Sequence, residues 1–284
     1  MGTRSTKRIG SHFKIIMAGI LLLLAAVLAA GVFFLRRPVV KKAHISVDDA
    51  TMIFQNICLN EYDSIFDNPI LGKLKELHDQ YGIRVTLYVY YELEEFSLAD
   101  MSLDYRNEFE ENADWLRIGF HSDTEEYSDL QEASIGDFMK AYARTQEAIR
   151  EFAGDASITK VLRLHYWYAT SNMVDFLHTQ GIEGLLCSDK KEPSYDLTIE
   201  ESKRLYASRD GTCEKNEMTY YATDIRLENA ENVEAVLEEH RKDRIIVVFT
   251  HAWCFMENGD KLEEVVRALS EAGYSFEWLE GDEE

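Results

Sequence analysis

The chain has 284 residues, 46% of them hydrophobic, and a formal charge of −22, so it is long enough for one large domain with a sizeable core and is not an unfolded polar chain. The charge is uneven: residues 1–42 hold eight Lys and Arg and no Asp or Glu, whereas the remainder holds 22 basic and 52 acidic residues. A domain this acidic repels phosphate backbones, which excludes nucleic acid as an expected partner.

The first feature along the chain is an apolar run over residues 15–35, IIMAGILLLLAAVLAAGVFFL, with a basic tail over 1–14 before it and a linker over 36–42 after it. About 20 apolar residues in a helix span the hydrocarbon core of a bilayer, so the run predicts a single-pass membrane anchor. The alternative is a signal peptide cleaved after Gly31, but Val32–Leu35 continue the apolar run past that point. Four basic residues lie on each side, so charge does not decide the orientation.

From residue 43 onward, strand-like and helix-like segments alternate. The predicted strands are 43–48, 83–91, 117–121, 160–167, 184–188, 218–227, 244–251 and 274–279. The predicted helices are 69–81, 104–116, 129–152, 170–180, 231–242 and 260–272, and residues 189–217 are predicted as a long loop. This alternation predicts a parallel sheet covered by helices, and its length favours a distorted β/α barrel of about seven parallel strands over 43–284.

Reactive side chains stand where several of these strands end, which is where β/α barrels build their active sites. They are Asp48–Asp49, His121, Arg163 with His165, Ser188–Asp189, and His251. Each has a simpler explanation alone: Asp49 could cap the following helix, and a single histidine near a strand is commonly a core residue. Their recurrence at the same end of successive strands favours a shared site.

The adjacent carboxylates of Asp48 and Asp49 repel each other unless a positive charge lies between them. The spacing from His121 to Glu125 is that of one helical turn, which would bring both side chains to one face. With Asp49 they would form a three-ligand metal site with open positions for water, and such an ion lowers the pKa of bound water. His165 or Asp123 could replace a ligand if the loop turns differently.

These residues resemble the motifs of the polysaccharide deacetylases, carbohydrate esterases of the chitooligosaccharide deacetylase type. SVDDA, ending at Ala50, is similar to the family's Thr/Ser-x-Asp-Asp-Gly motif, and HSDTE, from His121, to its His-Ser/Thr-x-x-His motif. RLHYW, from Arg163, resembles the third motif, with a histidine in place of proline. Asp189 is the nearest match to the fourth motif, and His251 matches the last.

The resemblance implies a metal-dependent enzyme that deacetylates an N- or O-acetylated polysaccharide or cell-surface glycan. The implied roles are metal binding by Asp49, His121 and Glu125, base catalysis by Asp48, acid catalysis by His251, orientation of Asp48 by Arg163 with Asp189, and substrate contact by His165, Trp167 and Trp253. Zinc is the expected ion, with manganese, iron or cobalt as alternatives. The resemblance also implies that the 43–284 domain lies outside the cytoplasm, at the cell membrane.

Three departures from the family motifs leave other functions open. Glu125 stands where the family has a metal-binding histidine, Ala50 where it has glycine, and His165 where it has proline. One alternative is a barrel that has lost its chemistry and serves as a binding or scaffold protein. Another is a hydrolase of a different carbon–nitrogen bond, in an amide that is neither a peptide nor a sugar.

Overall fold

The computed structural model describes residues 40–126 and 128–280. The predicted basic tail (1–14) and membrane anchor (15–35) therefore lie outside the described residues. Within the described ranges, no helix is both long enough and apolar enough to cross a membrane. Residues 41–284 make up one compact unit, and the fold below is that of its described part.

The strands are β1 (Lys41–Asp48), β2 (Val85–Tyr90), β3 (Glu92–Leu93), β4 (Phe96–Ser97), β5 (Leu116–Ser122), β6 (Val161–Leu162), β7 (Gly184–Leu186), β8 (Thr212–Lys215), β9 (Met218–Tyr221), β10 (Ile225–Arg226), β11 (Ile245–His251) and β12 (Tyr274–Phe276). The α-helices are α2 (Thr51–Asn60), α3 (Pro69–Tyr81), α4 (Arg106–Glu111), α5 (Ser128–Gln131), α6 (Ile135–Ala153), α7 (Ser171–Thr179), α8 (Ile199–Ala207), α9 (Val233–Glu239) and α10 (Phe255–Glu271). The 3₁₀ helices are η1 (Ile65–Asp67), η2 (Leu98–Asp100), η3 (Leu103–Tyr105), η4 (Asp155–Ser157), η5 (His165–Trp167), η6 (Leu227–Asn229) and η7 (Ala252–Cys254).

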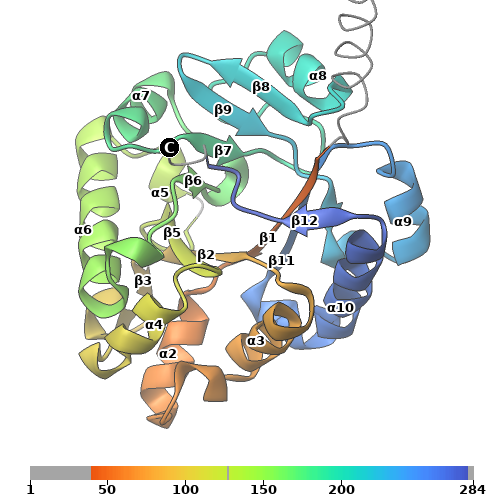
Figure 1. The fold of residues 1–284 in the computed structure, drawn as a ribbon. Coiled ribbons are helices and arrows are strands. Elements are labelled where there is room, and N and C mark those ends of the chain that lie inside the picture. The colour runs from red at the N-terminus through yellow and green to blue at the C-terminus, as the bar shows by residue number, and fades with distance from the viewer. Residues whose placement is uncertain (1–39, 127, 281–284) are drawn as a thin grey trace, which may run out of the picture. The chain divides into compact units, whose positions relative to one another are not determined.

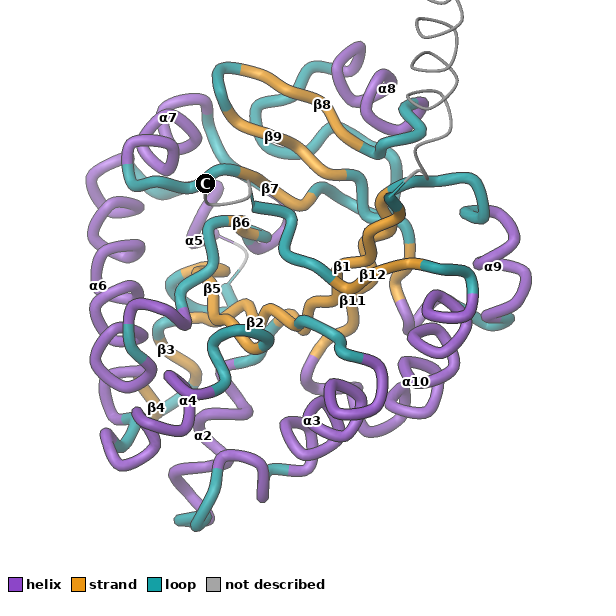
Figure 2. Tube along the Cα trace, in the orientation of Figure 1, coloured by secondary structure: helices purple, strands orange, loops and turns teal. Residues whose placement is uncertain are grey.

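Parallel strands form the centre of the domain (Figure 1). One sheet has the order β10-β11-β1-β2-β5, with β12 beside the start of β1, and another has the order β6-β7-β9-β8, in which only β8 is antiparallel. Two features join these sheets: a bridge between Ile118 and Ile158, and the segment 218–226, which pairs with β7 through β9 and with β11 through β10. The strands thus follow one another around a distorted parallel barrel, and Figure 2 shows helices around it, confirming the predicted α/β architecture.

Burial explains why these strands stay parallel and central. Every residue of β2 is buried, as expected of a strand covered on both faces, and its side chains are apolar or aromatic apart from Thr86. The ladder between β1 and β11 sets Asp48 opposite His251, and the ladder between β2 and β5 sets Tyr90 opposite Ser122. Parallel pairing therefore brings the polar C-terminal ends of these strands to one end of the barrel.

The structure corrects the predicted strand over 160–167. Only Val161–Leu162 are extended in a ladder, and the chain then turns into η5, where Tyr166 and Trp167 have positive φ angles of 55° and 52°. The strand ends there because the next backbone polar groups hydrogen-bond to side chains and not to a neighbouring strand. The carbonyl of Arg163 pairs with His121, and the amide of Leu164 donates to the Tyr195 hydroxyl.

The predicted long loop over 189–217 is also wrong, because it contains α8 and β8. Thr198 caps α8 by accepting a hydrogen bond from the Glu201 amide, while the Glu201 side chain accepts from the Thr198 amide. This is a capping box, and its Thr-x-x-Glu pattern is visible in the sequence. Elsewhere, the predicted helix over 104–116 shortens to α4, and the predicted strand over 218–227 divides into β9 and β10.

Candidate functional site

The C-terminal ends of the barrel strands surround a pocket of about 320 Å³. Its walls are formed by Asp48, Asp49, His121, Arg163, Leu164, His165, Tyr166, Trp167, Lys190, Arg226, His251 and Trp253. Eight of the ten site residues predicted from the sequence therefore lie together here, at the end of the barrel where β/α folds place their chemistry. The two that do not are Glu125 and Asp189.

Asp48 lies at the bottom of this pocket and is 2% exposed. Its Oδ1 atom lies 3.3 Å from the Nε atom of Arg163, which is fully buried. Burial raises the pKa of Asp48, while the charges of Arg163, His121 and His251 act in the opposite direction. A carboxylate with a raised pKa and an adjacent guanidinium is suited to accept a proton.

Asp49 has a left-handed backbone with φ 55°, which turns its side chain into the pocket. Its Oδ1 atom accepts a hydrogen bond from Tyr90 and lies 3.4 Å from His121 Nε2, and its Oδ2 atom accepts from Trp253 Nε1 at 3.0 Å. Burial opposes ionisation, but the hydrogen bonds and charge of His121, with the Tyr90 hydroxyl, hold the pKa of Asp49 well below its usual range. Asp49 is not a helix cap, because α2 begins without a side-chain capping bond.

Two imidazoles face Asp49. His121 is the next-to-last residue of β5 and is 3% exposed. Its Nδ1 atom lies 2.5 Å from the carbonyl oxygen of Arg163, which leaves Nε2 toward Asp49. His165 enters from η5, and each of Asp49, His121 and His165 offers one ligand atom within 4.8 Å of the others. Burial, with the charges of His121 and His251, lowers the pKa of His165 to about 3, so the imidazole is held in its neutral, metal-binding form.

The chemistry of this donor set fits a divalent cation. Two imidazoles and a carboxylate are the ligands of several catalytic zinc sites and of non-haem iron sites. The Nδ1 atom of His121 is held by a backbone carbonyl, an arrangement that fixes ring orientation in metal-ligating histidines. The structure thus groups His165, and not Glu125, with Asp49 and His121 as a candidate ligand set.

Glu125 does not join these residues. The chain after β5 forms bends rather than a helical turn, and Glu125 is exposed there. The prediction that helical spacing would place Glu125 beside His121 is therefore wrong. Asp123, the other substitute ligand considered, pairs with Arg144, whose Nε atom lies 2.8 Å from Asp123 Oδ1.

Asp189 does not form the predicted pair with Arg163. It lies in the turn after β7, and within the described residues its side chain has no ion pair with that guanidinium. Arg163 instead donates through Nη1 to Thr223 Oγ1 at 3.0 Å and through Nη2 to Ser46 Oγ at 3.4 Å. The early end of β6 explains the difference, since it directs Arg163 across the barrel interior toward β1.

His251 ends β11 and is held by a carboxylate that the sequence analysis did not select. Glu228, in η6, accepts from the backbone amide of His251 at 2.8 Å, and its Oε1 atom lies 3.2 Å from His251 Nδ1. Burial disfavours the imidazolium, but the Glu228 hydrogen bond and the charges of Asp48 and Asp49 outweigh it and raise the pKa of His251. His251 is thereby suited to donate a proton near neutral pH.

Tyr90 is the second functional candidate that the sequence analysis missed. It is 3% exposed, and its hydroxyl contacts both Asp49 and His165. A signal was present, because Tyr90 lies near the end of a predicted strand, as the other site residues do. Glu228 gave the same signal, because it directly follows the predicted strand over 218–227, but it belongs to none of the motifs compared above.

Aromatic side chains form the rim. Trp253 is 59% exposed and its ring lies 5.2 Å from that of His251, while Tyr166 is 48% exposed and packs against His165 at 4.1 Å. Trp167 also lines the pocket, with Lys190 Nζ 6.0 Å from its ring centre. Flat apolar faces beside polar groups are suited to contact a sugar ring.

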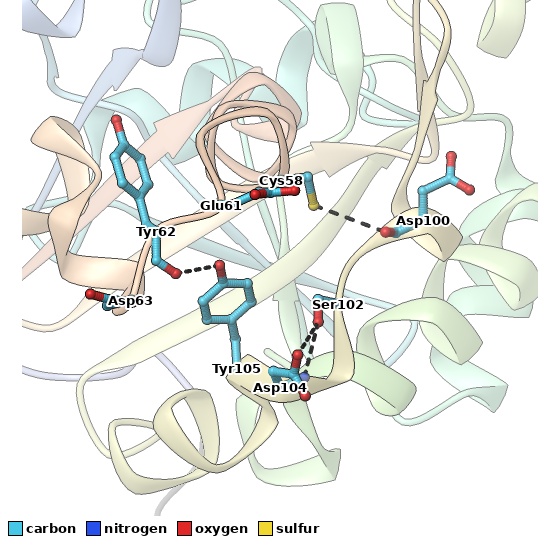
Figure 3. Close-up of a pocket in the computed structure, with 8 residues that line it drawn as sticks. All are labelled: Cys58, Glu61, Tyr62, Asp63, Asp100, Ser102, Asp104 and Tyr105. Atoms are coloured by element: carbon cyan, nitrogen blue, oxygen red, sulfur yellow. Dashed lines mark hydrogen bonds between the residues drawn. The ribbon is translucent and has the colours of Figure 1, made fainter.

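A larger pocket of about 570 Å³ lies beside the end of α2 (Figure 3). It is lined by Cys58, Glu61, Tyr62, Asp63, Asp100, Ser102, Asp104 and Tyr105. All the charged groups among these lining residues are acidic, and the lining includes no histidine or arginine. The larger pocket thus lacks the mixed set of carboxylates, imidazoles and guanidinium that lines the smaller one.

The solved structures that resemble this chain include proteins assigned to the deacetylases and esterases, and a pseudoenzyme. A protein from Mycobacterium smegmatis assigned to the polysaccharide deacetylases matches with a TM-score of 0.50 and 12% identity, over 86% of this chain and 89% of its own. The chain therefore has the polysaccharide deacetylase fold. No protein-family model matches the sequence, and no curated protein matches it.

Two further structures of carbohydrate esterase family 4 match the deacetylase fold of this chain less well. A pseudoenzyme of that family from Bacillus anthracis has a TM-score of 0.46 and 10% identity, over 84% of this chain and 64% of its own. An esterase of that family from Streptococcus mutans has a TM-score of 0.44 and 13% identity, over 83% of this chain and 84% of its own.

The buried ion pair of Arg163 and Asp48 allows a prediction about the stability of the fold. Arg163→Met leaves Asp48 buried without its cation, and we expect a loss of about 3–5 kcal/mol in the free energy of unfolding. The native state favours protonated Asp48, so the loss should shrink as pH falls and be largest above neutral pH. Urea unfolding at two pH values measures this, and an equal loss at both would contradict it.

Proposed function

We propose that this chain is a metal-dependent hydrolase that removes acetyl groups from an N- or O-acetylated polysaccharide or cell-surface glycan. The observation that carries the proposal is one pocket in which a candidate ligand set, Asp49 with His121 and His165, lies beside the buried carboxylate of Asp48 and the imidazole of His251. The deacetylase fold supports it. A bound divalent cation would supply Lewis-acid chemistry, polarising the acetyl carbonyl and acidifying a water molecule.

The protein groups divide the proton transfers between them. Asp48, with Arg163 beside it, would accept a proton from the attacking water. His251, kept protonated by Glu228, would donate a proton to the leaving amine or alcohol. Asp48 and His251 are register partners in the β1–β11 ladder, so the proposed base and acid would lie side by side at the pocket.

The membrane location is proposed from the sequence. Residues 15–35 would anchor the chain in the cell membrane, with the 43–284 domain on the extracytoplasmic side, where a surface glycan is reached. Protease added to intact cells should digest the 43–284 domain. If the domain is digested only after the cell membrane is permeabilised, it lies on the cytoplasmic side.

The experiment that tests the function uses the purified full chain loaded with zinc, manganese, iron or cobalt. Acetate release is measured on N-acetylated and O-acetylated oligosaccharides and on small acetylated amides that are not sugars. Turnover on the sugars supports the proposal. Turnover on the other amides alone would make the chain a hydrolase of a different carbon–nitrogen bond, and metal binding without turnover would favour a binding protein.

The candidate ligand set predicts opposite effects on zinc affinity for two variants. His165→Ala should weaken zinc affinity by more than about 100-fold, since loss of even a supporting partner of a ligand costs about 10–100-fold. Glu125→Ala should leave the affinity unchanged, because Glu125 is exposed and outside the cluster. Calorimetric zinc titration compares the two variants, and the reverse ranking would restore Glu125 as the ligand.

A further inference from the structure

The candidate site carries more positive than negative charge, although the domain around it is acidic. From residue 43 onward the chain has 22 basic and 52 acidic residues, yet the charged side chains that line this pocket are Asp48, Asp49, Arg163, Lys190 and Arg226. Three cations against two carboxylates leave one net positive charge, with the histidines counted as neutral. The pocket thus differs in sign from the domain as a whole.

Two of the three cations can meet a bound molecule. Arg163 is fully buried and already bonds Asp48 and two hydroxyl groups, so it has no surface to offer. Arg226 is half-buried and Lys190 is exposed. The positive charge that a ligand encounters in this pocket therefore comes from Arg226 and Lys190.

Arg226 is the last residue of β10, so it reaches the pocket from a strand end as other site residues do. Its Nε atom donates to Glu228 Oε2 at 3.2 Å, and its guanidinium lies 5.6 Å from the centre of the Phe249 ring. Within residues 40–126 and 128–280, neither of its Nη atoms forms a hydrogen bond. The guanidinium is thus fixed on one side and keeps free donors on the other, in the fork that matches pairs of anionic oxygens.

Lys190 reaches the same pocket from the turn after β7. Its Nζ atom lies 6.0 Å from the centre of the Trp167 ring, and it forms no ion pair with any residue that the structure describes. The next residue, Lys191, instead lies 3.7 Å from Glu239 and does not line this pocket. Lys190 therefore brings an unpaired positive charge to the pocket, and Lys191 does not.

The strand order places these two cations on one part of the barrel wall. β7 pairs with β9, the chain runs from β9 into β10, and β10 pairs with β11. Lys190 and Arg226 therefore come from the wall between β6, which leads to His165, and β11, which ends in His251. This wall is separate from β1 and β5, which supply the other two candidate ligands.

We propose that the acetylated glycan carries an anionic group, a carboxylate, phosphate or sulfate, and that Arg226 and Lys190 bind this group. The inference rests on the proposed function and names the substrate class of that same site. The acidic surplus of the domain does not prevent such binding. At physiological salt the Debye length is about 8 Å, so the charges that line the pocket act on the substrate while more distant exposed charges are screened.

The test measures acetate release by the metal-loaded full chain on matched oligosaccharides of N-acetylglucosamine, with O-acetylated counterparts. Four forms are compared: neutral, sulfated, phosphorylated, and alternating with glucuronate. We expect kcat/KM to be at least about 10-fold higher on an anionic form than on the neutral one, because hydrogen bonds between charged groups are stronger than neutral ones. The form with the highest value identifies the source of the negative charge.

Two variants and a matched control assign the preference to residues. Arg226→Gln should lower the ratio of anionic to neutral kcat/KM by about 10-fold, and Lys190→Gln by about 2–5-fold, since an exposed charge contributes less. Lys191→Gln should leave the ratio unchanged, because Lys191 pairs with Glu239 outside the pocket. Added salt should reduce the ratio in the wild-type chain.

The other outcomes separate this inference from the proposed function. Equal kcat/KM on neutral and anionic forms by the wild-type chain would overturn the inference and leave the proposed function standing. An unchanged ratio in Arg226→Gln would also overturn it, and a loss of rate shared by all forms would make Arg226 a positioning residue for Glu228. If Arg226→Gln does not fold, the wild-type ratio and its change in Lys190→Gln decide.

If no form releases acetate, the proposed function fails, and calorimetric binding of the same oligosaccharides decides the inference. Tighter binding of an anionic form, lost in Arg226→Gln or Lys190→Gln, supports it. Equal affinity for neutral and anionic forms overturns it.

Discussion

Replacement of Asp49 by asparagine is expected to reduce zinc affinity by more than about 100-fold and to abolish acetate release. The amide keeps the shape of the side chain and one of the two acceptor oxygens, to which Tyr90 and Trp253 donate separately, but it removes the negative charge that a cation needs. Asparagine is the right replacement because it tolerates the left-handed backbone that Asp49 adopts at φ 55°, whereas alanine would add backbone strain. Calorimetric titration and an acetate assay measure the two effects.

Asp123→Asn is the matched control. Asp123 lies two residues after His121 and is bound to Arg144 rather than to the cluster, so this variant should bind zinc as the wild-type chain does. If Asp49→Asn kept its full deacetylase activity, Asp49 would not be a ligand of the metal ion. Equal losses in both variants would show that acidic charge in general, and not this ligand, governs binding.

Replacement of His251 by alanine is expected to lower kcat by about 10²–10⁴-fold, the usual contribution of a general acid, without changing zinc affinity. In the wild-type chain, activity should fall as pH rises through the His251 pKa, which Glu228 and the two aspartates raise above its ordinary value. In His251→Ala that alkaline fall should be absent. A pH profile of kcat with both proteins makes the comparison.

The variant Glu228→Gln tests whether Glu228 sets the pKa of His251. Its loss removes a cause of the raised pKa of His251, so the alkaline fall in activity should move to lower pH while the residual rate at acidic pH stays closer to that of the wild type. A uniform loss at every pH would mean that Glu228 supports only the structure around His251. An unshifted profile in Glu228→Gln would assign the fall to a different group.

The fold was largely accessible from the sequence because its signals are local. Apolar, β-branched strands alternate with helices that end at glycine, as Gly82 does after α3, and this pattern specifies a parallel barrel. The errors fall where backbone groups bond to distant side chains. The turn at Arg163 depends on His121 and Tyr195, and the division of the 218–227 segment depends on pairing with two different strands.

The site was accessible in part for a related reason. The topology brings together the residues at or next to the C-terminal ends of parallel strands, which are Asp48, Asp49, His121, Arg163 and His251. The third ligand could not be chosen from spacing, because the choice between Glu125 and His165 depends on whether residues 123–126 continue as a helix. Residues 123–125 form bends, and η5 instead brings His165 to the pocket.

The break in the strand ladder between β5 and β6 would give a bound ion a structural effect. A single bridge between Ile118 and Ile158 joins the backbones there, and side chains complete the junction: Tyr88 bonds the Val161 carbonyl, and His121 bonds that of Arg163. An ion held by His121 on one side and His165 on the other would cross-link this junction. Removal of the ion should therefore loosen the junction, which hydrogen exchange of the backbone amides in β5 and β6 would report.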